Sequence, residues 1–260
     1  MKRRVDERDW LPLSGKARAI EIAPTGEAFK PEWIDFERGI RVGNLEPHER
    51  ITRILKYHLE QQYGTPFITD RWGRGVYWQW ICWLPRANRE AKPVSAKLNF
   101  GCAKFFISAD RVNRVLQAGL QIERGYARAE PRRDGTPPPW VLARDWDWHK
   151  LMKGCAAGTA LDAELRRLVV KEGFCVKLEG APRTRVFAAG VFPSAAALKT
   201  AAANCAKDQW AGFQVFYPMP ASEVASCSGY DLVKAILSAF REVLPVMNLC
   251  MDVPLKAPAH

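Results

Sequence analysis

Three consecutive prolines at positions 137–139 close an arginine-rich segment and set the strongest limit on how this chain can fold. Proline fixes its own backbone and has no N–H group to donate, so neither a helix nor a central strand can run through this segment. An Asp-Gly pair just before the prolines adds a turn. Because long loops usually carry function or separate structural units, we expect two halves, residues 1–125 and 141–260, joined by a loop over residues 126–140.

Hydrophobic periodicity predicts helices and strands in the first half. A helix is expected from Asn44, a good N-cap, to Gly64, because apolar residues recur between them with a period of 3.6. Alternation of apolar and polar residues predicts strands instead. The expected strands cover residues 17–23, 67–69, 76–84, 94–100 and 120–123, and a second, short helix is expected over residues 108–117.

The second half contains the same mixture of elements. Helices are expected over residues 145–153, 160–172, 194–207 and 230–243, and strands over residues 174–179, 184–192, 212–217 and 246–251. Read coarsely, each half runs strand, helix, two or more strands, helix, strand, which is the order of a ferredoxin-like unit. The expected fold class is therefore α+β, with two tandem ferredoxin-like units built on antiparallel sheets.

The positive charge of the chain is concentrated in one region. The net charge is +11, and between Arg71 and Arg133 there are thirteen Lys or Arg residues against four Asp or Glu. Concentrated positive charge is typical of a surface that binds a polyanion, whereas evenly spread charge only favours solubility. A nucleic acid is therefore the expected partner. A membrane is not, because the longest mostly apolar run, residues 76–84, is far too short to cross a bilayer.

Seven cysteines are spread through the chain without any Cys-x-x-Cys pair. This spacing does not favour a zinc knuckle or a disulfide framework, and predicts reduced, buried thiols in a cytoplasmic protein. The N-terminus has charged residues but no apolar segment, so it is not expected to be a secretory signal. The sequence contains no phosphate-binding or dinucleotide-binding motif, and its acidic residues do not cluster as a two-metal nuclease requires. Neither a cofactor nor a metal site is expected.

Arginines at helical spacing form the first candidate binding surface. Arg50, Arg53 and Tyr57 are spaced as one stripe of the longer expected helix, and Arg111 and Arg114 are spaced likewise on the short one. Guanidinium groups at this spacing can bind successive phosphates. The alternative is a solvated helix face whose arginines pair with carboxylates of the same helix.

Two further segments combine aromatic residues with arginines. Within residues 72–83, alternation is expected to place Trp78 and Trp80 on one face of a strand and Trp83 on the other. One face is core, and the other could stack unpaired bases, although burial on both faces is favoured for most of these rings because tryptophan is costly to expose. In the loop, Tyr126 lies among arginines, which suits a phosphate backbone with a stacked base. The alternative there is a linker whose charge only aids solubility.

Arginines make up the whole set of expected nucleic-acid contacts. They are Arg38, Arg50, Arg53, Arg74, Arg86, Arg89, Arg111, Arg114, Arg124, Arg128, Arg132 and Arg133. Aromatic residues beside arginines favour single-stranded or looped RNA over duplex DNA. Separately, Asp145 and His149 lie one helical turn apart and could act as an acid–base pair or share a metal, but Asp145 is also a good N-cap. We expect the structural role, and no metal.

These features together resemble the repeat-cleaving endoribonucleases of CRISPR systems, which are basic, of similar size, metal-independent and built from two ferredoxin-like units. The resemblance covers the architecture of the whole chain, but one family feature is missing. In place of the family's glycine-rich loop near the C-terminus, residues 209–228 contain only Gly212. Catalytic residues vary within that family, so none is carried over by position, and chemistry alone selects the candidates. Without metal, the 2′-hydroxyl of RNA would be the nucleophile, and His48, His149 and Tyr126 are the side chains that could move protons.

The leading hypothesis is an RNA-binding protein that could also process structured RNA as a metal-independent endoribonuclease within a ribonucleoprotein. The main alternative is a non-catalytic DNA-binding or defence-associated interaction protein that uses the same basic surface. A third class is a small-molecule enzyme whose basic patch binds an anionic substrate. Salt dependence separates these classes, because a protein that contacts the phosphate backbone loses affinity steeply as salt rises.

Overall fold

The protein is α+β in this computed structural model, which describes residues 23–92, 101–124, 146–180, 184–187, 190–205 and 210–256. Several expected features lie outside these residues. They are the strand at 94–100, all but the last residue of the strand at 17–23, the loop at 126–140, and Tyr126, Arg128, Arg132, Arg133 and Asp145.

The described strands form one sheet in which every pairing is antiparallel. They are β1 (Ile34–Asp35), β2 (Gly39–Arg41), β3 (Phe67–Arg74), β4 (Tyr77–Pro85), β5 (Lys104–Asp110), β6 (Val115–Arg124), β7 (Cys175–Gly180), β8 (Arg185–Phe187) and β9 (Ala211–Pro220). The order is β1-β2-β4-β5-β6-β9-β7-β8. Strands β2 and β5 pair with one edge of β4, and β3, which is outside this order, pairs with the opposite edge. The two halves of the chain meet where β6 and β9 pair along their full lengths.

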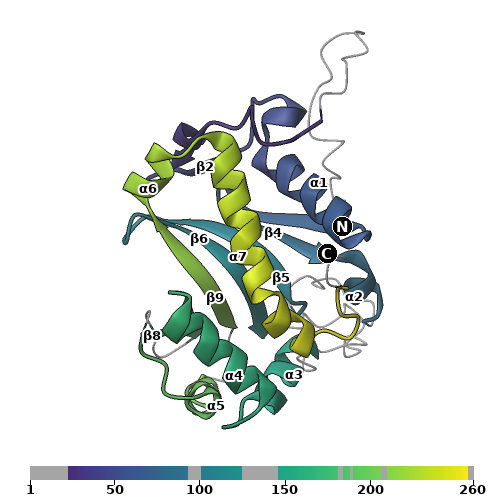
Figure 1. The fold of residues 1–260 in the computed structure, drawn as a ribbon, viewed down its shortest axis with the longest axis vertical. Helices are drawn as coiled ribbons and strands as arrows, with labels where there is room; N and C mark the ends of the chain where they lie inside the picture. Colours follow the sequence, from purple (N-terminus) through teal and green to yellow (C-terminus); the bar gives the residue numbers. More distant parts are fainter. Residues whose placement is uncertain are drawn as a thin grey trace, which may run out of the picture.

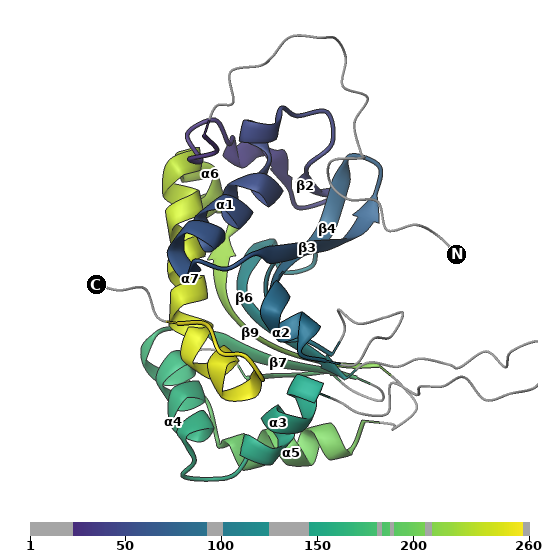
Figure 2. The ribbon, with the colours of Figure 1, turned by 90° about the vertical axis from the view of Figure 1, so that its right-hand side faces the viewer.

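Helices cover the convex face of the sheet. They are α1 (Ile51–Tyr63), α2 (Arg86–Glu90), α3 (Trp146–Gly154), α4 (Ala160–Arg166), α5 (Ala195–Ala203), α6 (Ala221–Ser226) and α7 (Gly229–Cys250), with short helices η2 (Pro31–Trp33), η3 (Pro47–Glu49) and η4 (Arg167–Lys171). Helix α7 runs across the middle of the sheet (Figure 1). Figure 2 shows the sheet curving away from α7, so that its opposite face is concave.

The helix boundaries of α1 and α7 differ most from the expected ones. Helix α1 ends at Gly64 as predicted, in the left-handed conformation that glycine favours, but it begins at Ile51 after a short 3₁₀ turn whose capping box joins Glu46 and Glu49. Helix α7 continues through Pro245 to Cys250, so the strand predicted at residues 246–251 is wrong. Apolar residues there extend the buried stripe of the helix, and this tertiary burial outweighs the hydrogen bond that proline removes.

The helix predicted over residues 108–117 is also wrong, because β5 and β6 form a hairpin there. Asp110 nucleates the turn: its Oδ1 accepts hydrogen bonds from the backbone N–H groups of Val112 and Asn113, at 2.9 and 3.1 Å. Arg114 completes the turn with a φ of +52°. Arg111 and Arg114 therefore lie at a hairpin tip and not along a helix face.

A β-bulge changes which faces the tryptophans of β4 occupy. Trp72 pairs with Trp80 and Gly73 pairs with Trp78, which leaves Gln79 without a cross-strand partner on β3. One extra residue reverses the alternation of side chains. Trp78 consequently joins Trp83 in the main core beneath the helices, while Trp80 lies on the opposite, concave face. The expectation that Trp78 and Trp80 share a face is wrong for this reason.

All seven cysteines are free thiols, as the sequence predicts. Five of them are buried, namely Cys82, Cys102, Cys155, Cys205 and Cys250. Burial raises the pKa of Cys102 and Cys155 to about 11, so almost none of either thiol is ionised near pH 8.

We expect an aromatic disulfide reagent at pH 8 to modify the partly exposed Cys175 and Cys227 first. The buried thiols should react only as the protein unfolds, because the thiolate is the reactive form. Absorbance of the released thiol gives the count of modified cysteines, and the protein in denaturant is the control in which all seven react. Rapid modification of all seven in the native protein would contradict the described core.

Candidate functional site

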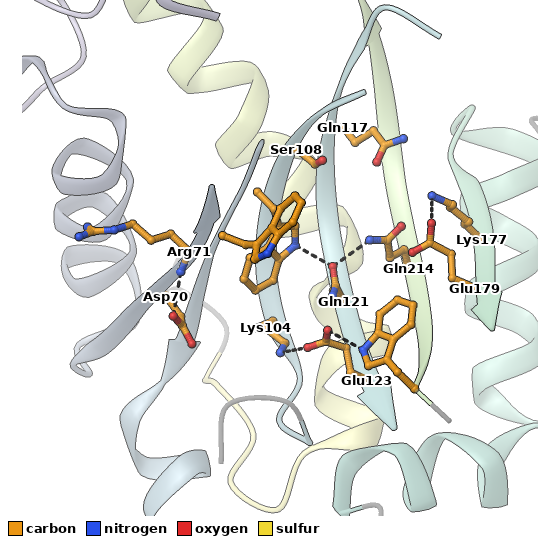
Figure 3. A pocket seen from close by; sticks show the side chains of 13 residues that line it. Asp70, Arg71, Lys104, Ser108, Gln117, Gln121, Glu123, Lys177, Glu179 and Gln214 are labelled. Carbon is orange, nitrogen blue, oxygen red and sulfur yellow. Dashed lines mark hydrogen bonds and ion pairs between the residues drawn. The ribbon is translucent and has the colours of Figure 1, made fainter. Parts of the chain in front are cut away.

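The concave face of the sheet contains a cavity of about 700 Å³. Side chains from β3, β4, β5, β6, β7 and β9 line it (Figure 3), and its lining comprises Asp70, Arg71, Trp72, Trp80, Lys104, Ser108, Gln117, Gln121, Glu123, Lys177, Glu179, Trp210 and Gln214. The volume falls within the range of roughly 300–1,000 Å³ that is usual for small-molecule sites. The three tryptophans supply flat apolar surface, and the other lining side chains are polar.

Four polar side chains form a continuous row across the floor of this cavity. The strand register pairs Lys104 with Gln121, Gln121 with Gln214, and Gln214 with Lys177. Lys104 is only 1% exposed, Gln121 4% and Gln214 6%. Polar residues that alternate with apolar ones along a strand usually face solvent. Burying them here costs free energy unless hydrogen bonds or a ligand compensate.

One tryptophan fixes the orientation of the two central amides. The indole Nε1 of Trp80 donates to Oε1 of Gln121 at 2.8 Å, and Nε2 of Gln214 donates to the same oxygen at 2.8 Å. An indole N–H can only donate, so Gln121 must present its oxygen to Trp80. Gln214 must then present its nitrogen to Gln121. Its Oε1 is left buried and without a hydrogen-bond donor among the described residues.

A buried ion pair closes one end of the row. Lys104 pairs with Glu123, whose Oε1 also accepts a hydrogen bond from Nε1 of Trp210 at 3.1 Å. Burial lowers the pKa of Lys104, but the neighbouring Glu123 carboxylate, together with Cys82 and Cys102, raises it, and the net pKa lies above the ordinary value. Lys104 is therefore an ammonium group at neutral pH. Its Nζ also lies 5.5 Å from the centre of the Trp80 ring.

The cavity has no excess of positive charge. At the other end of the row, Lys177 pairs with Glu179, so both lysines of the lining are matched by a carboxylate. Asp70 adds a third carboxylate, and the side chain of Arg71 points away from the cavity (Figure 3). This set of charges does not suit a phosphate, which needs unbalanced cations. It suits a neutral, flat, hydrogen-bonding group.

A cluster of arginines lies at the end of the sheet beside Trp72 and Trp80. Tyr77 is its centre: Arg41 and Arg74 flank Tyr77 in the strand register, and the guanidinium of Arg38 lies 4.3 Å from the centre of its ring. The hairpin between β5 and β6 brings further arginines close by. We call Arg38, Arg41, Arg74, Arg111 and Arg114 the arginine end.

Two carboxylates partly neutralise the arginine end. Asp35 pairs with Arg38, while Glu37 pairs with Arg111 at 2.7 Å and with Arg114 at 3.5 Å. Five guanidinium groups against these two carboxylates leave a positive excess. The excess borders the cavity, because Gly73 and Arg74 directly follow Trp72 on β3 and Trp72 pairs with Trp80. Trp72 is 69% exposed at this boundary.

The structure separates the other sequence-predicted arginines from this cluster. Arg50 is buried, and its Nε donates to the carbonyl oxygen of Leu45 at 2.8 Å, so its guanidinium holds the turn before α1 and does not form a surface stripe with Arg53. Three more predicted contacts lie elsewhere on the sheet and α2, namely Arg86, Arg89 and Arg124. Four of the predicted arginines are therefore gathered at one place: Arg38, Arg74, Arg111 and Arg114.

The two catalytic candidates that the structure describes do not line the cavity. His48 lies in the short helix η3, and His149 is exposed on α3. Within the described ranges, no group of three His, Cys, Asp or Glu side chains could hold a metal ion. Nor is any helix in those ranges long and apolar enough to cross a membrane.

Comparison of the chain with protein-family models, curated proteins and solved structures gives no match. Function is therefore inferred from the site alone. Sequence reasoning missed its central residues, Lys104, Gln121, Glu123 and Gln214. The signal available for them was the alternation of polar with apolar residues along β6 and β9, which reads equally well as the solvent face of a sheet.

Proposed function

We propose that this protein binds single-stranded RNA, with the phosphate backbone at the arginine end and an unpaired base in the concave-face cavity. The observation that carries the proposal is the contact between a surface with excess positive charge and a cavity that has no such excess and is lined by tryptophans. A nucleotide has the same division, because its phosphate requires cations and its base requires flat apolar surface with a few hydrogen bonds.

Trp72 supports this proposal because it lies between the two parts. A tryptophan that is 69% exposed is unusual, since burial of the large ring is favourable. Base–aromatic stacking contributes about 1–3 kcal/mol per base, and it requires such an accessible ring. The cavity itself can accept a base only if that base is unstacked, which favours single strands and loops over duplexes.

We also propose that the protein cleaves the RNA that it binds. Attack of a 2′-hydroxyl on the adjacent phosphate would leave a 2′,3′-cyclic phosphate and a free 5′-hydroxyl, without metal. The basic charge and the α+β architecture are compatible with the CRISPR-type processing enzymes. The division into two ferredoxin-like units, with β1 to β6 in one and β7 to β9 in the other, belongs to this proposal too. End-group analysis of a structured RNA incubated with the protein in EDTA tests the cleavage step.

Fluorescence anisotropy with labelled 12-nucleotide RNA and DNA of the same sequence tests the binding proposal. We expect RNA to bind more tightly than DNA, and log Kd to rise by about 0.7 per log unit of salt for each phosphate contact. A DNA preference would favour the alternative of a DNA-binding protein. A shallow salt dependence of binding, or no binding to either the RNA or the DNA, would overturn the proposal.

Arg74 offers the sharpest test of the arginine end. We expect Arg74→Gln to weaken binding of every RNA sequence by a similar factor, about fivefold at 0.1 M salt, and to lower the salt slope by about 0.7. Arg241→Gln is the matched control, because Arg241 is exposed on α7 in the helical layer. Equal affinities for both variants would show that the backbone does not bind at the arginine end.

A further inference from the structure

The hydrogen bond between Gln121 and Gln214 indicates which kind of base the cavity would bind. We propose that the cavity recognises a neutral planar heterocycle that bears an exocyclic amino group, as in adenine or cytosine, through Oε1 of Gln214. This inference rests on the proposed function where the base belongs to RNA. The same chemical group could also arrive as a free nucleoside, and the two sources are separable by experiment.

Gln214 offers a hydrogen-bond acceptor and not a donor to a ligand. Trp80 fixes the oxygen of Gln121, and that oxygen in turn fixes the nitrogen of Gln214. Turning the Gln214 amide over would bring two oxygens together. The polar atom of Gln214 that does not bond to Gln121 is therefore its Oε1, which is buried and has no donor within the described structure. A buried acceptor without a partner is costly, so a ligand that donates to it binds favourably.

The charges beside Gln214 favour a neutral donor. Lys104 and Lys177 occupy the two ends of the row that contains Gln214. Each of these ammonium groups is paired with a carboxylate, Glu123 or Glu179, so the ends of the row have no unpaired positive charge that would attract an anionic ligand. A neutral donor suits a row whose charges are already paired. The exocyclic amino group of a base is such a donor.

The shape of the cavity suits an aromatic heterocycle. The indole rings of Trp80 and Trp210 both line the cavity, and each is held by its own hydrogen bond, to Gln121 and to Glu123 respectively. Rings whose N–H groups are already bonded offer only flat apolar surface to a ligand, which suits an aromatic heterocycle. Side-chain amides are the groups that proteins use to read the amino-bearing edge of adenine. The volume of about 700 Å³ leaves room for a base with its ribose.

Two pairs of nucleosides test the inference, because the members of each pair differ by an amino group against a carbonyl. They are adenosine with inosine, and cytidine with uridine. We expect adenosine and cytidine to bind about tenfold more tightly than their partners, measured by quenching of tryptophan fluorescence and by calorimetry. Equal affinities within both pairs, or no nucleoside binding at all, would overturn the inference.

Variants test whether the preference for an amino group depends on Gln121 and Gln214. Gln214→Met should reduce the amino preference to about twofold or less, whereas Gln62→Met, a glutamine on α1 outside the cavity, should keep it. Trp80→Phe changes neither glutamine but removes the donor that orients them, so it should also reduce the preference. Melting temperatures check that each variant is folded. A preference that survives both cavity variants would show that Gln214 does not read the amino group.

Binding measurements with RNA distinguish this inference from the proposed function. If 12-nucleotide RNAs rich in A and C bind no better than oligo-U although all bind with a steep salt slope, RNA binding stands and the inference fails. If adenosine and cytidine are preferred but no RNA binds, the cavity is a nucleoside site and the proposed function fails. Preference at both levels supports the two together.

Discussion

A Lys92→Met variant is expected to lose about 3–5 kcal/mol of its free energy of unfolding, because the substitution leaves a buried carboxylate without its partner. Nζ of Lys92 contacts Oδ1 of Asp147 at 2.8 Å and Oδ2 of Asp252 at 2.8 Å, and it also donates to Asn88. Asp147 is 0% exposed. These bonds join the end of α2, the first turn of α3 and the segment after α7, and urea denaturation followed by circular dichroism measures the loss.

Lys150→Met is the matched control for this substitution. Lys150 also pairs with Asp252, but its side chain is 39% exposed, so we expect a loss of at most about 1 kcal/mol. Similar losses for the two variants would mean that the buried pair does not hold these segments together. Such a result would also question the structural role of Asp147.

The deficit of the Lys92→Met variant should shrink as the pH falls. Burial raises the pKa of Asp147 above its ordinary value, although Lys92 partly opposes this, and removal of Lys92 should raise that pKa further. A group whose pKa is higher in the folded state binds protons on folding, so protonation at low pH relieves the cost of burying it. Unfolding measured at pH 5 and pH 8 checks the sign, and a deficit that grows toward pH 5 would contradict it.

A Gly119→Ala variant is expected to lose about 3 kcal/mol or more, because an added methyl group would meet backbone rather than a movable side chain. A Cβ at Gly119 would lie 1.9 Å from the carbonyl oxygen of Val215 and 2.7 Å from Cα of Phe216, both on β9. Since β6 and β9 could accommodate it only by separating, the Gln121–Gln214 pair should be disturbed as well. We therefore expect weaker nucleoside binding together with lower stability.

Gly64→Ala provides the comparison for Gly119. Gly64 ends α1 with a φ of +60°, and an added Cβ would have no atom within 4 Å. Only the left-handed backbone conformation opposes alanine there, at a cost of roughly 1–2 kcal/mol. Thermal unfolding of both variants separates steric conflict from backbone preference. Equal losses would show that β6 and β9 have room to adjust at Gly119.

Many helices and strands could be predicted from the sequence, because hydrophobic periodicity and capping residues act over short stretches of chain. The helix at α1, the serine cap of α5 and the strands β3, β4 and β7 follow from periodicity and capping residues. Two failures have specific causes. Asp110 starts a hairpin turn inside a stretch that also has helical spacing, and one bulged residue, Gln79, exchanges the faces of β4.

The cavity could not be predicted in the same way, because its residues come together only through long-range strand pairing. Gln121 and Gln214 are far apart in the sequence and adjacent only because β6 pairs with β9. The arginine end was partly predictable, since concentrated charge is visible in the sequence. The central position of Tyr77 could not be predicted, because only the pairing of β2 and β3 with β4 brings Arg41 and Arg74 beside Tyr77.

The seam between β6 and β9 also determines what an incomplete chain would expose. Both strands are ten residues long, and β6 comes from the first half of the chain while β9 comes from the second. Until β9 arrives, one edge of β6 presents a long row of unpaired N–H and C=O groups, which is a template for pairing with another molecule. A nascent or truncated chain that ends before β9 should therefore aggregate through this edge, and completion of the seam both forms the cavity and removes the hazard.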